Sequence, residues 1–273
     1  MIYANDITQW GVNHPWATRD DIEQDLLLSQ AICEIANDPL LGSELVIRGG
    51  TAFHKLFLQK PYRYSEDLDY VRSSAGGIGQ IIRQLVTIGE KLGYKANSNL
   101  SKYPKVLWKT VSESGQPIRI KIEINTYERT PAMPLVVKQF GIDTEYYHSN
   151  ANVTTFQPEE LIATKIRALY QRSKGRDLFD IWLALELLKL DPATIVYAFN
   201  VYRPEGLTAE LAIRNLKRKL EDRKFLNDLY GLAMQREIDL VAEYGIGLVA
   251  EIGSLYITAY NSLIFCILKT MFQ

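Results

Sequence analysis

The chain has 273 residues, 47% of them hydrophobic and 23% charged, which is ordinary for a soluble globular protein of one large domain or two modest ones. The formal net charge is −1, so overall electrostatic attraction to nucleic acid is not indicated and any RNA binding requires a local basic patch. Cys33 and Cys266 provide neither a disulfide framework nor metal-ligand spacing, and the polar N-terminus lacks a secretory signal pattern. We therefore expect a cytoplasmic protein.

The first helix is expected to begin after Thr18, where Asp21 three residues later resembles a capping box. It ends at the turn sequence of residues 37–39. A short apolar strand over residues 45–47 then runs into a pair of glycines, and the segment 51–58 is expected to form the next helix.

A second strand is predicted over residues 67–71. Side chains alternate along a strand, so Leu68 and Tyr70 face one side while Asp67 and Asp69 face the other. Two carboxylates at this spacing repel each other, and a hard divalent cation such as Mg²⁺ removes the repulsion. The spacing therefore predicts a metal site, with a solvated strand end as the alternative.

The residues around this strand suit phosphate binding. Gly49 and Gly50 have no side chains, so their backbone N–H groups can approach phosphate oxygens closely, and Ser65 adds a hydroxyl donor. A helix over residues 78–92 follows, and then strands over 105–111 and 118–127. Glu123 lies on the polar face of the last strand, as a third metal ligand or as a surface partner of Lys121.

From residue 155 onward the pattern is helical, so we place a domain boundary between 154 and 155. Helices are predicted at 158–172, from about 177 to 190, and at 192–199, 208–223 and 225–244. The apolar stretch 254–272 contains polar residues and is expected to be a packed helix rather than a membrane span.

The first two of these helices hold a cluster of charged residues. Lys165 is expected to neutralise triphosphate charge and Arg176 to grip phosphate with two donors. Asp180 is expected to orient Lys165 across the helical hairpin or to bind nucleotide or metal. An interhelical salt-bridge network is the alternative. The basic run 214–224 is expected to be a solvated helix face, with contact to an RNA backbone as its alternative.

These motifs resemble a known family. The strings IRGGTAFHKLFL and YRYSEDLDYV, followed by EELIATKIRALYQRSKGRDLFDIWLAL, are similar to the AbiEii/AbiGii toxin family, which includes the MenT toxins, among the DNA polymerase β-like nucleotidyltransferases. The likeness covers roughly residues 20–190. It implies an α+β fold, in which a polymerase β-like core of mixed sheet and flanking helices (1–154) precedes a helical C-terminal domain (155–273) that contributes Lys165 and Asp180 to the site.

The resemblance also implies a reaction. A nucleoside monophosphate is transferred from an NTP to an RNA acceptor with Mg²⁺, or Mn²⁺ in its place; in characterised relatives the acceptor is the tRNA 3′ end, and translation is blocked. A cognate antitoxin is the implied partner, and no membrane is involved.

Residue patterns and resemblance together define the expected site. The catalytic residues are Asp67, Asp69, Lys165 and Asp180; the nucleotide-binding residues are Gly49, Gly50, Thr51, Ser65, Lys165 and Arg176; and the metal ligands are Asp67, Asp69 and Glu123. Two other functions remain open: a nucleotidyltransferase acting on a small molecule such as a sugar or antibiotic, and a nucleotide-binding module without turnover.

Overall fold

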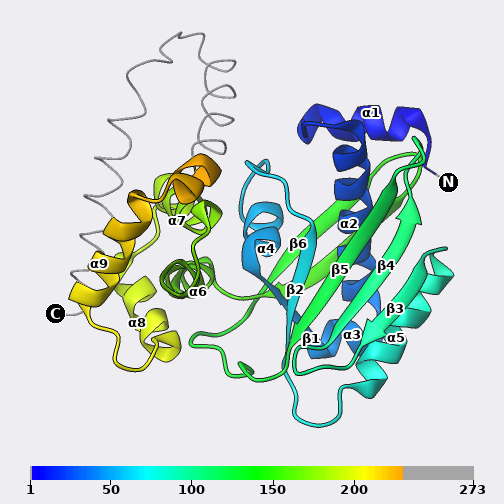
Figure 1. Ribbon diagram of the computed structural model, residues 1–273. Coiled ribbons are helices and arrows are strands. Elements are labelled where there is room, and N and C mark those ends of the chain that lie inside the picture. Colours follow the sequence, from blue (N-terminus) through cyan, green and yellow to red (C-terminus); the bar gives the residue numbers. More distant parts are fainter. Residues whose placement is uncertain (1, 230–273) are drawn as a thin grey trace, which may run out of the picture. The chain divides into compact units, whose positions relative to one another are not determined.

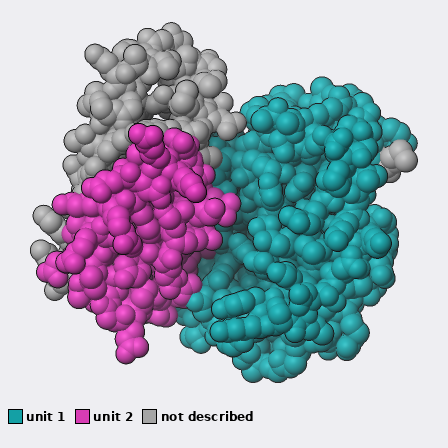
Figure 2. Space-filling model, viewed as in Figure 1, with its two compact units in different colours: residues 1–157 teal, residues 158–273 magenta. Residues whose placement is uncertain are grey.

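The computed structural model describes residues 2–229 and divides into two compact units, Met1–Gln157 and Pro158–Gln273 (Figures 1 and 2). Most of the helix predicted at 225–244, and the whole apolar stretch 254–272, lie outside the described residues. Within the described part of the chain, no helix combines the length and the apolar character needed to cross a membrane.

The first unit is built on a seven-stranded sheet with the order β3-β4-β5-β2-β1-β7-β6 (Figure 1). β2 pairs with β5, and β1 with β7, in parallel, and the other neighbours are antiparallel. This mixed sheet with flanking helices confirms the predicted α+β class. The strands are β1 (Leu45–Arg48), β2 (Asp67–Arg72), β3 (Lys95–Asn99), β4 (Lys105–Val111), β5 (Pro117–Asn125), β6 (Val136–Asp143) and β7 (His148–Thr155).

Five helices belong to this unit. α1 (Ala4–Asn13) and α3 (Pro39–Glu44) were not predicted, whereas the capping box at the start of α2 is confirmed. The side chain of Asp38 accepts hydrogen bonds from the N–H groups of Leu40 and Leu41, so the turn that ends α2 also begins α3. The other helices are α2 (Arg19–Asn37), α4 (Gly49–Leu56) and α5 (Gly79–Lys91).

One face of the sheet forms the core of this unit. Leu68 and Tyr70 of β2 are buried, and Ile122 of β5 and Trp108 of β4 are fully enclosed beside them. α2 packs on β5 and α5 packs on β4, so helices cover this side. The apolar residues of β2 fix which way the strand faces, because a slip of one residue would bury Asp67 and Asp69 instead.

A buried ion pair anchors α4. The ammonium of Lys55 lies 2.9 Å from Asp25 Oδ1 of α2 and donates to Ser29 Oγ at 2.8 Å. Asp25 also accepts a hydrogen bond of 2.9 Å from Trp10 Nε1 of α1. Since a buried charge without a partner is costly, these bonds hold α1, α2 and α4 together.

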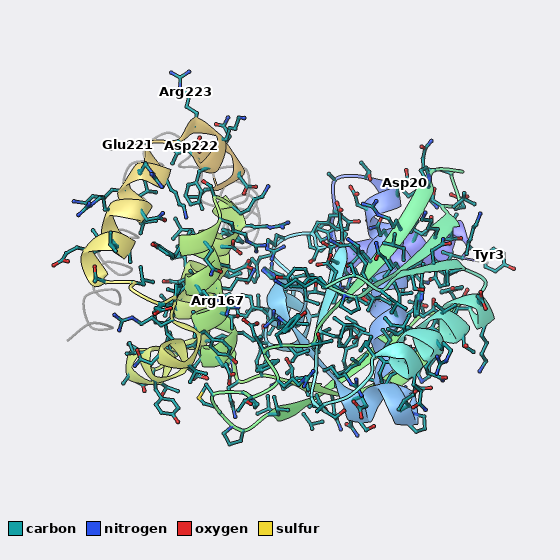
Figure 3. The ribbon with its side chains drawn as sticks, turned by 60° about the horizontal axis from the view of Figure 1, so that its bottom comes forward. Tyr3, Asp20, Arg167, Glu221, Asp222 and Arg223 are labelled. Atoms are coloured by element: carbon teal, nitrogen blue, oxygen red, sulfur yellow. The ribbon has the colours of Figure 1, made fainter. Side chains whose placement is uncertain are left out.

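The second unit is helical in its described part: α6 (Pro158–Gln171), α7 (Gly175–Leu188), α8 (Pro192–Tyr202) and α9 (Ala209–Leu220). Lys219 of α9 points inward and donates to the carbonyls of Leu169, Tyr170 and Arg172 at the end of α6. Burial lowers the pKa of Lys219 to about 8, with the charge of Arg218 adding to the effect. The basic run is therefore only partly a solvated face, and Figure 3 shows Arg223 extending outward from it.

Substitution of Gly89 tests how closely α5 packs on the sheet. A Cβ at this position would lie 2.5 Å from Trp108 Nε1, and the Trp108 ring is fully buried and donates to Leu85 O. We expect Gly89→Ala to lower the free energy of unfolding by about 1–3 kcal/mol, because the overlap exceeds the gain in helix propensity. Gly77→Ala, where a Cβ meets nothing within 4 Å, is the control. Urea unfolding measures both, and equal stabilities would contradict the packing described.

Candidate active site

Asp67 and Asp69 lie on the side of β2 opposite the core. The burial of β2 alternates, with both aspartates partly exposed and Leu68 and Tyr70 buried, which confirms the predicted facing of this strand. β5 runs parallel to β2, and its register places Lys121 beside Asp67 and Glu123 beside Asp69. Neighbours in register point to the same side, so this sheet face carries three carboxylates within two adjacent strands.

Lys121 compensates the charge of two of these carboxylates. Its ammonium lies 2.8 Å from Asp67 Oδ2 and 3.3 Å from Glu123 Oε1. Partial burial alone would lower the pKa of Lys121, but the hydrogen bond and charge of Asp67, together with the charge of Glu123, raise the pKa above its ordinary value. The predicted pairing of Glu123 with Lys121 is therefore present, and the same lysine also bridges to Asp67.

Two further cations flank the carboxylates. Arg48 of β1 is the register partner of Asp69, and Lys105 of β4 is the register partner of Glu123. A row of four charged residues thus crosses β1, β2, β5 and β4 in the order Arg48, Asp69, Glu123, Lys105. Arg48 Nη1 also lies 2.6 Å from Glu128 Oε2, in the loop that follows β5. The row is basic at both ends and acidic at its centre.

Gly49 allows the start of α4 to lie close to the side chain of Asp69. It begins α4 with a φ of +82°, a conformation that favours glycine, and a Cβ there would lie 2.7 Å from Asp69 Oδ2. The first turn of α4 therefore starts directly beside this carboxylate. Backbone N–H groups at a helix N-terminus attract anions, so Gly49 and Gly50 fit a phosphate.

Thr51 and Ser65 join the start of α4 to the start of β2. Thr51 Oγ1 donates to the carbonyl of Asp67 at 2.6 Å, and it lies 2.6 Å from Ser65 Oγ. Since a hydroxyl has one proton, Ser65 is the donor in the second bond. Thr51 is buried, so its hydroxyl positions Asp67, and the Ser65 oxygen keeps its acceptor capacity.

The donor chemistry of this face fits a hard divalent cation. Carboxylate oxygens are the protein ligands that Mg²⁺ takes, and Asp67, Asp69 and Glu123 provide them from two paired strands. Among residues 2–229, however, no three histidine, cysteine, aspartate or glutamate side chains are already gathered as a metal centre. Lys121 stands between Asp67 and Glu123 and supplies part of the positive charge that a cation would supply.

The remaining predicted residues belong to the second unit. Lys165 of α6 is buried, and its ammonium lies 3.1 Å from Asp177 Oδ1 and 2.9 Å from Asp180 Oδ2 of α7. The expected contact across the helical hairpin is therefore present. Arg172 adds hydrogen bonds of 2.7 and 2.8 Å to Asp177, so two cations balance two buried carboxylates in a salt-bridge network. Arg176 is exposed at the start of α7.

Asp177 is the residue of this network whose role sequence reasoning missed. Burial would raise the pKa of its carboxyl, but the hydrogen bonds of Arg172 and the charge of Lys165 outweigh burial and lower the pKa. On the sheet face, the bridging position of Lys121 and the flanking positions of Arg48 and Lys105 were also missed. Only the pairing of distant strands reveals these three, so no local signal identifies them.

The chain is similar to known proteins in sequence and in fold. The family model described as nucleotidyl transferase AbiEii toxin of the type IV toxin–antitoxin system matches residues 30–242. Solved structures similar to this chain include MenT4, a nucleotidyltransferase toxin of Mycobacterium tuberculosis H37Rv, at 17% identity and a TM-score of 0.55, covering 73% of this chain and 69% of that one. An antigenic nucleotidyltransferase-like protein of Paracoccidioides brasiliensis has 18% identity and a TM-score of 0.42, with 74% and 91% covered. No curated protein matches the chain.

The salt-bridge network of the second unit should depend on Asp177. Asp177→Ala leaves the buried ammonium of Lys165 with fewer partners, so we expect the α6–α7 hairpin to lose about 3 kcal/mol of local stability. Because the pKa of Asp177 is lowered from 3.8 in the folded chain, its contribution is present above pH 4 and disappears as the pH falls further. Hydrogen exchange of the α6 and α7 amides measures the change.

Glu221→Ala is the control for that experiment, because Glu221 is exposed at the end of α9 (Figure 3). It should leave the exchange rates of α6 and α7 unchanged. Wild-type protection in the Asp177 variant would show that the network contributes nothing to the hairpin.

Proposed function

The chain belongs to the AbiEii family of nucleotidyltransferase toxins of type IV toxin–antitoxin systems, and we propose that it transfers a nucleoside monophosphate from an NTP to RNA, with tRNA as the acceptor. The observation that carries this proposal is the sheet face on which Asp67, Asp69 and Glu123 lie together beside the first turn of α4. Acidic ligands and a phosphate-binding helix start are the two elements that nucleotidyl transfer requires.

The residues of this face have distinct proposed roles. Asp67, Asp69 and Glu123 would hold Mg²⁺, or Mn²⁺ in its place, and the metal, when bound, would supply positive charge against the attacking and leaving oxygens. Gly49 and Gly50 direct N–H groups to the phosphates, and Ser65 lies at the same helix start.

The transfer is a displacement at phosphorus. The acceptor's hydroxyl oxygen forms a bond to the α-phosphorus of the NTP, the bond to pyrophosphate breaks, and the hydroxyl proton passes to solvent. Arg48 and Lys105 flank the carboxylates and provide positive charge for phosphate groups at either side. An RNA modified in this way at the tRNA 3′ end no longer accepts an amino acid, so translation stops, and a cognate antitoxin in the cytoplasm holds the activity in check.

Lys165, Asp180 and Arg176 complete the proposal from the second unit. Lys165 is a phosphate contact in this proposal and Asp180 orients it, which is consistent with their separation of 2.9 Å. Phosphate oxygens then compete with Asp177 and Asp180 for one ammonium. Arg176 is exposed at the start of α7, and its guanidinium has the donors for a bidentate phosphate contact.

The carboxylates of β2 provide the direct test. Asp67→Asn and Asp69→Asn should each reduce transfer from a labelled NTP to total RNA at least about a hundredfold, because each removes a charge that holds the metal. The thermal midpoint should change little, because both side chains are partly exposed and the relief of repulsion between the two acids offsets the loss of one ion pair with Lys121. Asp143→Asn, whose side chain is 90% exposed on β6, is the control. Undiminished transfer by both β2 variants would refute the proposal.

Lys121 gives a second test that does not depend on turnover. Lys121→Met removes the ammonium between Asp67 and Glu123, so we expect Mg²⁺ to bind on the order of tenfold more tightly. The measurement is the Mg²⁺ concentration that gives half of the maximal rise in melting temperature. Lys109→Met, at an exposed position of β4, should leave this concentration unchanged. Weaker binding by the Lys121 variant would show that the lysine supports the metal instead of competing with it.

A further inference from the structure

Two tyrosines beside the acidic face are exposed. Tyr103 is 57% exposed in the turn before β4, and Tyr127 is 61% exposed in the turn after β5. Their rings contact each other edge to face, with centroids 6.4 Å apart. Leu100, nearby in sequence, is 64% exposed as well, so the two rings belong to a group of exposed apolar side chains and are not isolated.

Sheet register places this pair next to the proposed active site. Tyr103 precedes Lys105 by two residues, and Lys105 is the register partner of Glu123 on β5. Tyr127 follows β5, and the next residue, Glu128, binds Arg48 at 2.6 Å. The rings therefore emerge from the two turns that adjoin the row of charges containing Asp69 and Glu123.

The backbone of these turns is held in place. The Asn125 side chain accepts hydrogen bonds from the N–H groups of Tyr127 and Glu128 at 2.8 and 2.9 Å, and it donates to the Glu128 carboxylate at 3.0 Å. Ser101 Oγ donates to Tyr103 O at 3.0 Å. A fixed backbone presents both rings without a large loss of entropy on binding.

Positive charge accompanies the rings. Lys102 Nζ lies 5.6 Å from the centroid of the Tyr103 ring, and Lys105 lies between this turn and Glu123. Aromatic rings with adjacent cations bind single-stranded nucleic acid, since each base has a face for stacking and each nucleotide carries a phosphate. The surface thus supplies both parts of such a site although the whole chain has a net charge of −1.

We propose that Tyr103 and Tyr127 form a stacking platform for unpaired bases of the RNA acceptor, with Lys102 and Lys105 contacting its phosphates. This inference rests on the proposed function and specifies the form of its acceptor, which is single-stranded at the reacting end. A protein partner would also bury exposed tyrosines, but it has no need of lysines leading from the rings to a phosphoryl-transfer site. Single-stranded RNA accounts for the rings, the cations and their location together.

The experiment measures binding of a fluorescein-labelled single-stranded RNA oligonucleotide to the full chain by fluorescence anisotropy, in EDTA and without NTP. Tyr103→Ala and Tyr127→Ala should each weaken binding about tenfold, the loss typical of one stacked base. Tyr103→Phe and Tyr127→Phe keep the stacking face and should bind within about twofold of the unchanged protein. Tyr3→Ala is the matched control, because Tyr3 is 68% exposed before α1 and points outward in Figure 3.

Three outcomes overturn the platform: wild-type affinity in both alanine variants, equal losses in the phenylalanine and alanine variants, or no measurable binding by the unchanged protein. Alanine variants that keep RNA affinity but lose antitoxin binding would assign the surface to the protein partner, which also overturns the platform.

Transfer from labelled NTP to total RNA is measured in parallel on the unchanged chain. If transfer occurs but the alanine variants keep RNA affinity, only the platform is refuted and the proposed function is retained. If the alanine variants lose RNA affinity but no transfer occurs with any NTP, the proposed function is refuted instead.

Discussion

Repulsion between carboxylates on one sheet face is the constraint on which the first unit depends. Asp67 and Asp69 point the same way because β2 is a strand, and parallel pairing with β5 adds Glu123 to them. The energy for holding like charges together comes from the opposite face, where Leu68 and its neighbours are fully buried. Burial on one side of the strand thus determines where the acids lie on the other.

The position of α4 follows from the same constraint. Its first residue must be glycine, since a Cβ on Gly49 would overlap the Asp69 carboxylate, and Thr51 in its first turn bonds to the Asp67 carbonyl. The far end of the helix is fixed by the ion pair of Lys55 with Asp25. Contacts at both ends therefore hold α4 in place, and its first turn lies beside the two aspartates. Precise placement of such groups is what catalysis of phosphoryl transfer requires.

Local patterns in the sequence were enough to predict the strand of Asp67 and Asp69, the helices around it and the hairpin contact of Lys165 with Asp180. These features depend on residues close in sequence, or on charges placed on successive helices. The pairing of β2 with β5 joins segments about fifty residues apart, so the bridging position of Lys121 and the neighbours of Glu123 were not predictable from periodicity. α3 was missed because Asp38 is both the C-cap residue of α2 and the N-cap residue of α3, so the turn that ends one helix also begins the next.

Charge balance distinguishes the two clusters that the sequence singled out. In the α6–α7 hairpin, Lys165 and Arg172 match Asp177 and Asp180, so that buried network is neutral and can support the fold by itself. On the sheet face, Lys121 bridges Asp67 and Glu123, Arg48 and Lys105 lie at the two ends of the row, and the aspartates are only partly buried. A partly exposed cluster of carboxylates and cations is accessible to a metal ion or a phosphate, whereas a closed buried network is not. The proposed metal chemistry therefore belongs to β2 and β5, whereas the salt bridges of Lys165 with Asp177 and Asp180 are explained within the second unit.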